Sequence, residues 1–468
     1  MPTSLTARSS FVVIAVIAIG VSPLAAQPAK TLAQKLDSLA GAGVARKLVV
    51  GSVVAVVKDN DTLLFKSYGK ADVEWDVPMT PDALFEIGSL TKQFTAVAIL
   101  QLRDQGKLSL DDDITKWLPD FDTHGNKVSL RRLLNHTSGI HDMTETPEFP
   151  SLISNRVFPR DSAYALIKRY PFDFPSGEMQ QYSNSGFWLL GLVVEKASAM
   201  TYEEYVEKKL FEPLGMKRSM YCNSTENIER RAHGYGVRNG QVVRAPTNVH
   251  TWGFSAGSLC STAADMVTWL KALHGGKVLT PASYAEMTTP AKLTEWATLR
   301  YGMGLGVYKD FNGLQLFEHG GVIAGFWTEA NWYPESKTAV VVLQNSNGIL
   351  DPEEVAELLA WALLRDGKPP AARERPFTGD PTLLVGRYKG RGRTGELTIE
   401  ITQGPQGLMA SANDATRSLP ARPLVWLDAW TFRVQGIVVT FHRSGSTGPA
   451  TELGFNPAKG LYFILKRQ

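Results

Sequence analysis

The sequence predicts an α+β protein in which an antiparallel sheet is flanked by helices, with a helical subdomain and a small all-β domain at the C-terminal end. Three observations predict this arrangement. Strand patterns occur near both ends of the first 365 residues, at 49–68 and 304–343, and the chain between them alternates helical patterns with loops. Short strand patterns return after a proline-containing segment near residue 370. A chain of 468 residues also exceeds what one compact core usually supports.

The first 26 residues have the organisation of a secretory signal. The basic residue Arg8 precedes an apolar run at 11–19, and the small residues Ala25 and Ala26 follow it. The run is about ten residues long, which is too short to span a bilayer. We expect cleavage after Ala26, no membrane span in the mature protein, and a periplasmic or secreted location in a bacterial envelope. A retained membrane anchor is the alternative.

Residues 27–367 are predicted to form the first domain, whose sheet begins with a hairpin. Two β-rich runs at 49–57 and 62–68 flank a polar turn, a pattern typical of antiparallel pairing. Apolar residues at helical spacing predict the helices, and Ser261 and Thr262 are capping candidates for one of them. The helices are expected at 32–39, 89–102, 162–168, 185–198, 263–273 and 352–364, and the other strands at 304–308, 314–318, 325–332 and 339–343.

A linker and a second domain follow. Residues 368–376 contain three prolines and are typical of a linker. Residues 377–468 contain short strand patterns with Gly or Pro in several turns, which predicts a small sandwich or barrel. Its strands are expected at 397–401, 431–434, 437–441, 451–455 and 461–465.

Composition and spacing argue against several classes of function. The net charge of +3 and the charged content of 20% give no reason to expect nucleic-acid binding. The eight histidines contain no His-x-His or His-Glu-x-x-His spacing, so we expect no metal. No glycine-rich phosphate loop follows a strand, so we expect no nucleotide and no other cofactor. The expected partner is a small-molecule or peptide substrate.

The chain has two cysteines, Cys222 and Cys260. In an exported protein they can form a disulfide, yet sequence does not establish that their side chains meet. Two independent buried thiols are an equal alternative. A thiol nucleophile at Cys260 is less favoured because nothing nearby supplies an obvious partner.

The pair Ser89 and Lys92 carries the strongest chemical signal. A serine hydroxyl needs a neighbouring base to become a nucleophile at neutral pH. Ser89 opens the predicted apolar helix 89–102, so Lys92 lies one turn further on, inside the fold. A lysine there must find partners or lose its charge, and a neutral amine can accept a proton. The alternative is a helix-capping serine followed by a surface lysine.

Two later motifs complete a pattern of acyl transfer through a covalent serine intermediate. Tyr182-Ser183-Asn184 follows a turn-rich segment and precedes the helix predicted at 185–198, so a loop can direct Tyr182 into a cleft. His319-Gly320-Gly321 ends a predicted strand, where glycines allow backbone N–H groups to approach an oxyanion closely. The alternatives are a core tyrosine and a tight turn with a surface histidine.

Together these motifs resemble the serine β-lactamase-related hydrolases, the superfamily of penicillin-recognising enzymes, over about residues 30–365. The resemblance includes Phe85-Glu86-Ile87-Gly88, the segment 133–139 (Leu-Leu-Asn-His-Thr-Ser-Gly) and the run from His319 to Asn345. It is greatest to the branch that contains class C β-lactamases, DD-peptidases, D-aminopeptidases and family VIII esterases. It implies a β-lactamase/transpeptidase-like fold for the first domain. The second domain resembles the lipocalin-like domains appended to some relatives.

The resemblance implies catalytic roles for the matching residues. Ser89 is expected to be the acylated nucleophile and Lys92 its helical partner. Tyr182 is expected to be the general base for acylation and for activation of the deacylating water. The backbone N–H groups of Ser89 and Val322 are expected to form the oxyanion hole.

The resemblance also implies substrate-binding residues and one departure from the family pattern. Asn184 is expected to bond Lys92 and a substrate amide or carbonyl, and His319, Gly320 and Gly321 are expected to line the substrate site. True β-lactamases and DD-peptidases usually carry a Lys-Thr-Gly motif where this chain has His319. A neutral histidine attracts a substrate carboxylate less than a permanent cation does. We therefore expect esters, or amides and peptides without a mandatory carboxylate; the alternative is β-lactamase, DD-peptidase or D-aminopeptidase activity on penicillins or cell-wall peptides.

Two other readings are less favoured. Gly253-Phe254-Ser255-Ala256-Gly257 matches the nucleophile elbow of α/β-hydrolases, but no buried strand is predicted before it and the next helix begins near Thr262. A non-catalytic ligand-binding or sensing module is the other alternative. A binding module has no need for a Ser89, Lys92 and Tyr182 set.

Overall fold

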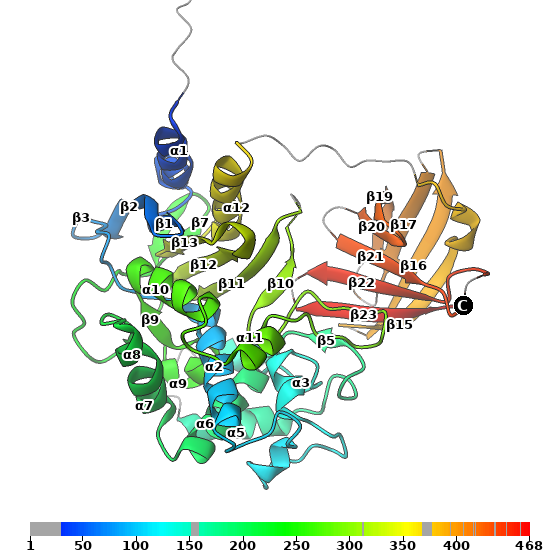
Figure 1. The fold of residues 1–468 in the computed structure, drawn as a ribbon, viewed down its shortest axis with the longest axis horizontal. Coiled ribbons are helices and arrows are strands. Elements are labelled where there is room, and N and C mark those ends of the chain that lie inside the picture. Colours follow the sequence, from blue (N-terminus) through cyan, green and yellow to red (C-terminus); the bar gives the residue numbers. More distant parts are fainter. Residues whose placement is uncertain are drawn as a thin grey trace, which may run out of the picture.

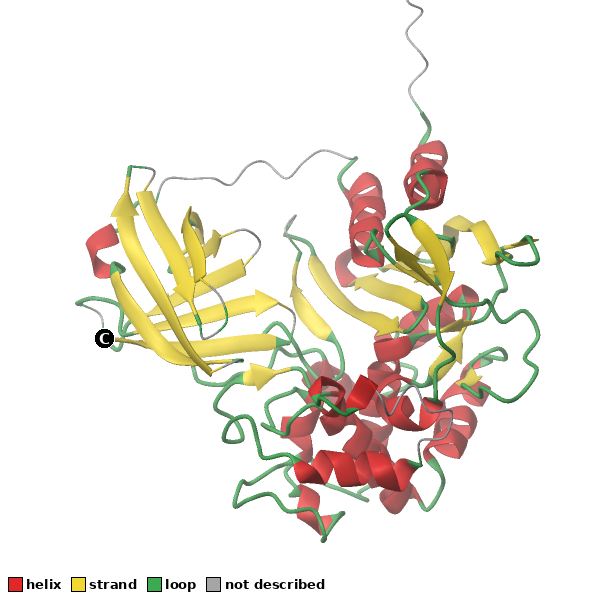
Figure 2. Ribbon diagram, turned by 180° about the vertical axis from the view of Figure 1, so that it is seen from behind, coloured by secondary structure: helices red, strands yellow, loops and turns green. Residues whose placement is uncertain are grey.

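The computed structural model of the chain describes residues 30–150, 159–310, 313–366 and 377–468, except positions 394, 406, 415, 417, 435, 436, 446 and 459. Two folded parts lie side by side, a larger one in which helices flank a sheet and a smaller one made of strands (Figures 1 and 2). The predicted signal at 1–26 and linker at 368–376 lie outside the described residues. Among the residues described, no helix is long and apolar enough to cross a membrane.

The larger part is built on a seven-stranded antiparallel sheet with the order β10-β11-β12-β13-β1-β2-β3. The hairpin predicted at its start is confirmed, and β1 pairs with β13 on its other side, so the two ends of this part meet in the sheet. The strands are β1 Gly51–Lys58, β2 Asp61–Asp72, β3 Val77–Pro78, β10 Gly306–Lys309, β11 Gln315–Ile323, β12 Phe326–Tyr333 and β13 Thr338–Gln344.

Helices cover both faces of this sheet. Alternate residues of a strand point to opposite faces. Val54 packs against α1 (Leu32–Ala45) and α12 (Pro352–Leu364), while Val53 packs into the core that α2 (Thr91–Asp104) and α10 (Ala263–His274) share. Because both sets of side chains are buried, β1 is continuously apolar from Val53 to Val57 rather than alternating. The predicted helix at 352–364 is confirmed with its boundaries.

Most helices gather on the side of the sheet opposite α1 and α12 (Figure 1). The predicted helices in this region are confirmed within a few residues. The Thr262 side chain caps α10 as expected, by accepting from the backbone N–H of Asp265. The helices are α2 Thr91–Asp104, α3 Leu130–Leu134, α5 Arg160–Arg169, α6 Asn184–Ser198, α7 Tyr202–Val206, α8 Glu212–Leu214, α9 His250–Gly257, α10 Ala263–His274 and α11 Pro281–Met287.

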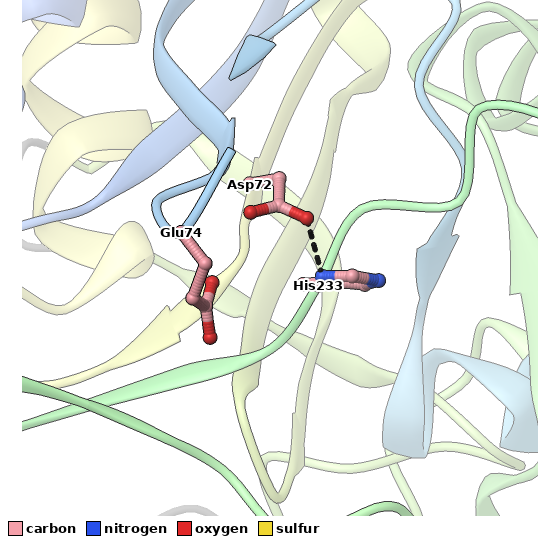
Figure 3. Close-up of side chains that lie close together, drawn as sticks. All are labelled: Asp72, Glu74 and His233. Atoms are coloured by element: carbon pink, nitrogen blue, oxygen red, sulfur yellow. Dashed lines mark ion pairs between the residues drawn. The ribbon is translucent and has the colours of Figure 1, made fainter. Parts of the chain in front are cut away.

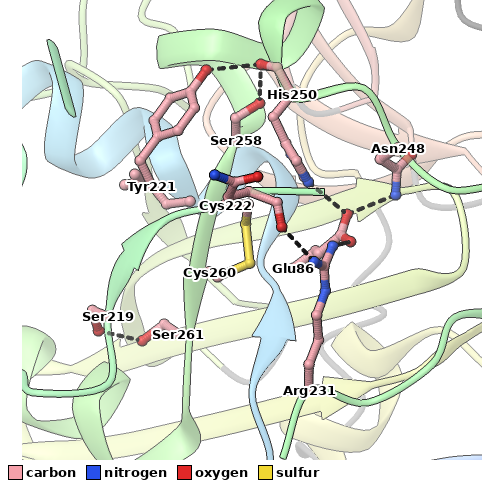
Figure 4. Close-up of a disulfide and its surroundings, with 12 residues drawn as sticks. Glu86, Ser219, Tyr221, Cys222, Arg231, Asn248, His250, Ser258, Cys260 and Ser261 are labelled. Carbon is pink, nitrogen blue, oxygen red and sulfur yellow. Dashed lines mark hydrogen bonds and ion pairs between the residues drawn. A yellow bond between two sulfur atoms is a disulfide. The ribbon is translucent and has the colours of Figure 1, made fainter. Parts of the chain in front are cut away.

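Short strands that the sequence did not predict join distant loops of this part. One small sheet has the order β4-β9-β6, formed by Phe85–Glu86, Leu259–Ser261 and Met220–Tyr221. Cys260 in β9 and Cys222 just after β6 form a disulfide, with their Cα atoms 5.2 Å apart (Figure 4). Of the two alternatives for the cysteines, the structure shows the disulfide and not two independent thiols. A second small sheet joins β14 Ser346–Asn347, β7 Tyr235–Arg238 and β8 Gln241–Arg244.

The C-terminal part is a barrel-like antiparallel sheet, as predicted. Its strand order is β18-β17-β16-β15-β23-β22-β21-β20-β19, and β5 (Gln180–Gln181) of the larger part also pairs with β23. Its interior is apolar and includes Phe432, Leu453 and Leu465. The strands are β15 Gly386–Gly392, β16 Gly395–Gly404, β17 Gly407–Asn413, β18 Ser418–Pro423, β19 Val425–Asp428, β20 Thr431–Val434, β21 Ile437–His442, β22 Glu452–Ala458 and β23 Leu461–Arg467.

Candidate active site

Ser89 lies at the junction of β4 and α2. It occupies a 3₁₀ turn over Gly88–Leu90 that leads directly into α2 at Thr91, and not the α-helix itself as predicted. The turn depends on Gly88, whose φ of +53° favours glycine. A Cβ at Gly88 would lie 2.9 Å from the backbone nitrogen of Val322. Glycine therefore lets β11 approach the turn closely, and the backbone of Val322 lies beside the residue that precedes Ser89.

Lys92, in the first turn of α2, is fully buried and directed at Ser89. Its Nζ donates to Ser89 Oγ at 3.1 Å, to Asn184 Oδ1 at 2.8 Å and to the backbone oxygen of Ala256 at 2.7 Å. Burial lowers the pKa of Lys92 to about 7, although the negative charge of Asp142 opposes the shift. Lys92 is therefore present in both charged and neutral forms near neutral pH. The predicted contact between Lys92 and Asn184 is observed.

Asp142 fixes the orientation of Asn184. The backbone nitrogen and the side-chain Nδ2 of Asn184 each donate to Asp142 Oδ2 at 3.0 Å. Because its amide nitrogen is engaged there, Asn184 presents Oδ1 to Lys92. Asp142 is itself buried at the start of the 3₁₀ helix Met143–Glu145. Sequence reasoning missed Asp142, because nothing in the local pattern links it to a residue 42 positions later.

Tyr182 lies between β5 and α6, in the loop position that the sequence predicts. Its ring packs against the ring of His136 with centroids 4.2 Å apart, and Lys92 Nζ lies 4.8 Å from the ring centre. Burial raises the pKa of the Tyr182 phenol above its ordinary value, and a hydrogen bond with Ser89 partly opposes the shift. Tyr182 therefore keeps its proton at neutral pH.

His136 is a second residue that sequence reasoning left without a role. It is buried and adopts a φ of +62°, which is uncommon for a residue other than glycine. Its Nδ1 accepts from the backbone nitrogen of Ser183 at 3.1 Å. Burial holds the pKa of His136 well below its ordinary value, and nearby Lys92 adds to that effect. His136 thus provides a neutral wall for the Tyr182 ring.

His319 lies inside β11, which continues to Ile323, whereas the sequence predicted that the strand ends at this motif. Its Nδ1 and the backbone oxygen of Gly320 are 2.6 Å apart, and its Nε2 and the Tyr301 hydroxyl are 2.9 Å apart. A neutral imidazole satisfies both bonds if Nδ1–H donates to the carbonyl and Nε2 accepts from the tyrosine. A Cβ at Gly321 would lie 2.0 Å from the backbone oxygen of Ile87, so only glycine fits there.

A cavity of about 180 Å³ opens in front of Ser89. Apolar side chains such as Phe149, Trp252 and Ile323 form much of its wall, and Thr144 and Asn184 add polar atoms. None of the lining residues carries a charge. The lining consists of Ser89, Thr144, Phe149, Asn184, Trp252, Gly253, Ala256, Gly257, Val322 and Ile323.

The alternative nucleophile, Ser255, is enclosed. Its side chain is fully buried, and Oγ donates to the backbone oxygens of Phe187 at 2.9 Å and Trp188 at 3.2 Å. The preceding Phe254 interrupts helix α9 with a φ of 37°. Ser255 therefore faces the packed side of α6 and not the cavity.

An ion-pair network beside the disulfide holds the strand that leads to Ser89 (Figure 4). Glu86 in β4 is buried and accepts from Arg231 Nη2 at 2.6 Å and from Asn248 Nδ2 at 2.7 Å. The same residue pairs with Cys260 across β4 and β9. The backbone before Ser89 is thus fixed from two sides.

One group of three possible metal donors exists in the described part of the chain, formed by Asp72, Glu74 and His233 (Figure 3). His233 Nδ1 pairs with Asp72 Oδ2 at 2.9 Å. Glu74 accepts from the Tyr235 hydroxyl and from Arg244. Because these side chains already bind one another and a neighbouring arginine, we assign no metal to them.

The chain is similar to known proteins over most of its length. The family model described as beta-lactamase matches residues 36–365. The chain is 28% identical to a penicillin-binding protein of Bacillus subtilis strain 168, over 73% of this chain and 78% of that protein. It is also 28% identical to a D-aminopeptidase of Gluconobacter oxydans strain 621H, over 80% of this chain and 69% of that protein. A solved structure of an octameric penicillin-binding protein homologue from Pyrococcus abyssi has a TM-score of 0.64 and 27% identity, over 92% of this chain and 99% of that one.

Proposed function

Since the chain belongs to the beta-lactamase family of serine hydrolases, we propose that it hydrolyses small esters or amides through an acyl-enzyme at Ser89. The observation that carries the proposal is the contact of 3.1 Å between Lys92 Nζ and Ser89 Oγ, made by a buried amine with a pKa of about 7. A neutral amine at this distance accepts the serine proton as Oγ attacks the substrate carbonyl.

Lys92 and Tyr182, the two groups beside the Ser89 hydroxyl, have different roles in the proposed proton transfers. We expected Tyr182 to act as the base in acylation, but burial raises the pKa of its phenol whereas burial lowers the pKa of Lys92. In the proposed mechanism Lys92 takes the proton from Ser89, and the Tyr182 hydroxyl donates its proton to the leaving group. Tyr182 is reprotonated from Lys92, and the same path in reverse activates the water that deacylates Ser89.

The backbone N–H groups of Ser89 and Val322 are the proposed oxyanion hole. The approach of β11 to Gly88 supports this assignment, because it brings the Val322 nitrogen beside the nucleophile turn. Asn184, held by Asp142, keeps Lys92 directed at Ser89 and lines the proposed substrate cavity.

The uncharged cavity supports neutral substrates. Its lining contains no cation that would attract a carboxylate, and His319 is engaged by Tyr301 and by the backbone of Gly320. We therefore propose that short-chain esters react fastest. The second candidate is hydrolysis of amides or peptides of D-amino acids, which the similarity to a D-aminopeptidase favours.

We further propose that the protein works in the periplasm or outside the cell. The signal-like first 26 residues support export. The disulfide between Cys222 and Cys260 supports it independently, because such bonds persist in oxidising compartments. Fractionation of cells that express the full chain, followed by N-terminal sequencing, tests cleavage after Ala26.

Covalent labelling tests the nucleophile. The mature protein is treated with a fluorophosphonate or with a penicillin, and the modified peptide is identified by mass spectrometry. We expect the adduct on Ser89, no adduct in Ser89→Ala, and normal labelling in the matched variant Ser255→Ala. Full activity of Ser89→Ala, or an adduct on Ser255, would contradict the assignment of Ser89 as the nucleophile.

A substrate panel tests the specificity. Short p-nitrophenyl esters, D-amino-acid amides and a chromogenic cephalosporin are compared by kcat/KM. We expect esters to rank first. Rapid cephalosporin hydrolysis would mean that a cation near His319 is not required for carboxylate recognition.

A further inference from the structure

The C-terminal barrel is joined to the active-site loop by backbone pairing. In β23, Leu461 pairs with Gln181 and Tyr462 pairs with Gln180, the two residues that precede Tyr182. Figure 1 shows β5 beside the end of β23. The short strand that precedes Tyr182 in the larger domain is therefore also hydrogen-bonded to a strand of the barrel.

The turn before β23 contacts Tyr182 itself. Gly460 is buried and has a φ of +70°. A Cβ at this position would lie 3.0 Å from Tyr182 Cβ and 3.1 Å from its Cδ2. His136 packs against the same ring with centroids 4.2 Å apart. The Tyr182 side chain is thus confined by a residue of the larger domain and by a residue of the barrel.

Other contacts fix the barrel in this position. Phe174 and Met179, from the segment that leads to β5, are buried in the barrel core. Trp296 stacks on His442 with centroids 4.7 Å apart, and its Nε1 donates to Glu452 at 3.0 Å. These contacts bury apolar and aromatic surface from both parts, which makes the docking a packed interface.

A second set of contacts joins the barrel, at β15 and the turn after it, to the loops near Asp142 and Asp173. Arg393, after β15, forms an ion pair with Glu145, and Arg391 donates to the backbone oxygen of Asp173. Glu145 belongs to the 3₁₀ helix that follows Asp142, the residue that orients Asn184. The barrel therefore contacts both loops that supply polar groups to Ser89 and Lys92.

We propose that the barrel is a working part of the hydrolase and that Gly460 is a positioning residue, which acts by holding the Tyr182 hydroxyl at Ser89. The inference rests on the proposed acylation of Ser89. A Cβ at residue 460 would press on the base of the Tyr182 ring at 3.0–3.1 Å, so the ring would have to shift by a few tenths of an ångström from its position against His136. Displacement of the ring moves the hydroxyl that serves the leaving group. It leaves the substrate cavity intact, because neither Gly460 nor Tyr182 lines it.

Matched glycine variants of the full chain test the proposal. Gly460→Ala is compared with Gly407→Ala, since Gly407 begins barrel strand β17, has a φ of +98° and has nothing within 4 Å of its Cβ position. Gly460→Asn and Gly407→Asn form a second pair, because asparagine tolerates positive φ and so separates backbone strain from contact with Tyr182. For each protein, kcat and KM for a p-nitrophenyl ester are measured per active site titrated with a fluorophosphonate, alongside the melting temperature.

We expect both Gly460 variants to lose at least tenfold in kcat with KM changed less than twofold, while both Gly407 variants behave as the wild type. Equal kcat in the Gly460→Asn and Gly407→Asn proteins would overturn the positioning role. A fall in kcat that tracks the melting temperature in all four variants would also overturn it, because the effect would then be general destabilisation. If the wild type itself does not react at Ser89, the proposed function fails rather than this inference.

Discussion

Lys92 illustrates how one buried residue sets the chemistry of this site. An amine without access to water loses part of its preference for the charged form, and the negative charge of Asp142 restores only some of it. The resulting pKa of about 7 leaves a large neutral fraction under ordinary conditions. That fraction can accept the proton of Ser89, whereas an exposed lysine at neutral pH cannot.

Acylation is accordingly expected to rise with pH and to level off above pH 7. Lys92 must be neutral to act as the base, so below its pKa of about 7 the acylation rate falls about tenfold per pH unit. Fluorophosphonate labelling in single-turnover experiments between pH 5 and 9 measures this profile. A rate independent of pH over that range would exclude Lys92 as the proton acceptor.

Removal of Asp142 is expected to change both the height and the position of the profile. In Asp142→Ala, Asn184 loses the acceptor that orients it, so the plateau of the acylation rate should fall about tenfold or more. The attraction that raises the pKa of Lys92 is lost as well, so the midpoint should move to lower pH. Asp161→Ala, in α5, is the control. A midpoint shifted to higher pH would contradict the assigned role of Asp142.

At the scale of the elements, β4 and β9 matter most because they connect the turn that contains Ser89 to the rest of the fold. Glu86 in β4 is a buried carboxylate with Arg231 and Asn248 as partners. Cys260 in β9 is covalently joined to Cys222 beside β6. A three-stranded sheet this short gains little stability from backbone pairing alone. The Glu86–Arg231 ion pair and the disulfide therefore supply much of its stability.

Loss of the disulfide is expected to lower stability more than activity. The bond closes a loop with a sequence separation of 38, and its removal in Cys222→Ala/Cys260→Ala should reduce the free energy of unfolding by about 2–4 kcal/mol. Urea denaturation of the variant and of the wild type, with and without reductant, measures the change. If reductant alters the wild type but the double variant unfolds at the wild-type midpoint, the bond does not contribute as proposed.

The Glu86–Arg231 pair is expected to show strong coupling. Arg231→Met leaves a buried carboxylate without its cation and should cost about 3 kcal/mol. The double variant Arg231→Met/Glu86→Gln removes that charge and should be more stable than Arg231→Met alone. Thermal or urea unfolding of the two single variants and the double variant completes the cycle. Additive losses would mean that the pair is not energetically coupled.

At the scale of the whole molecule, the two parts pack against each other. The barrel core takes in Phe174 and Met179 from the larger part, and β5 of the larger part pairs with β23 of the barrel. The loop that contains Tyr182 therefore lies at the junction of the two parts.

A chain that ends at residue 366 is therefore expected to be impaired. Truncation exposes Phe174 and Met179 and removes the strand that pairs with β5. We expect a melting temperature lower by several degrees, greater aggregation, and acylation at least tenfold slower. Calorimetry, light scattering and active-site titration of the truncated and full chains measure these effects. A truncated protein as stable and as reactive as the full chain would show that the barrel is an independent module.

Features that depend on short-range pattern were predictable. The hairpin of β1 and β2, the helix α12 and the spacing of Ser89 and Lys92 all follow from local periodicity, caps and turns. The order of the Ser89, Tyr182 and His319 motifs also predicted that these residues meet. The exact turn at Ser89 was not predictable, because it depends on how closely β11 approaches Gly88.

The sequence by itself determined the α+β class, the all-β C-terminal part and the set of residues around Ser89, because each is encoded in periodicity or in a compact motif. Only the tertiary structure decided that Asp142 orients Asn184, that His319 is bonded to Tyr301, that Cys222 and Cys260 pair, and that Gly460 touches Tyr182. Those contacts join segments from 18 to about 280 residues apart. Such pairings are selected by the packing of whole elements, and no local spacing in the chain records them.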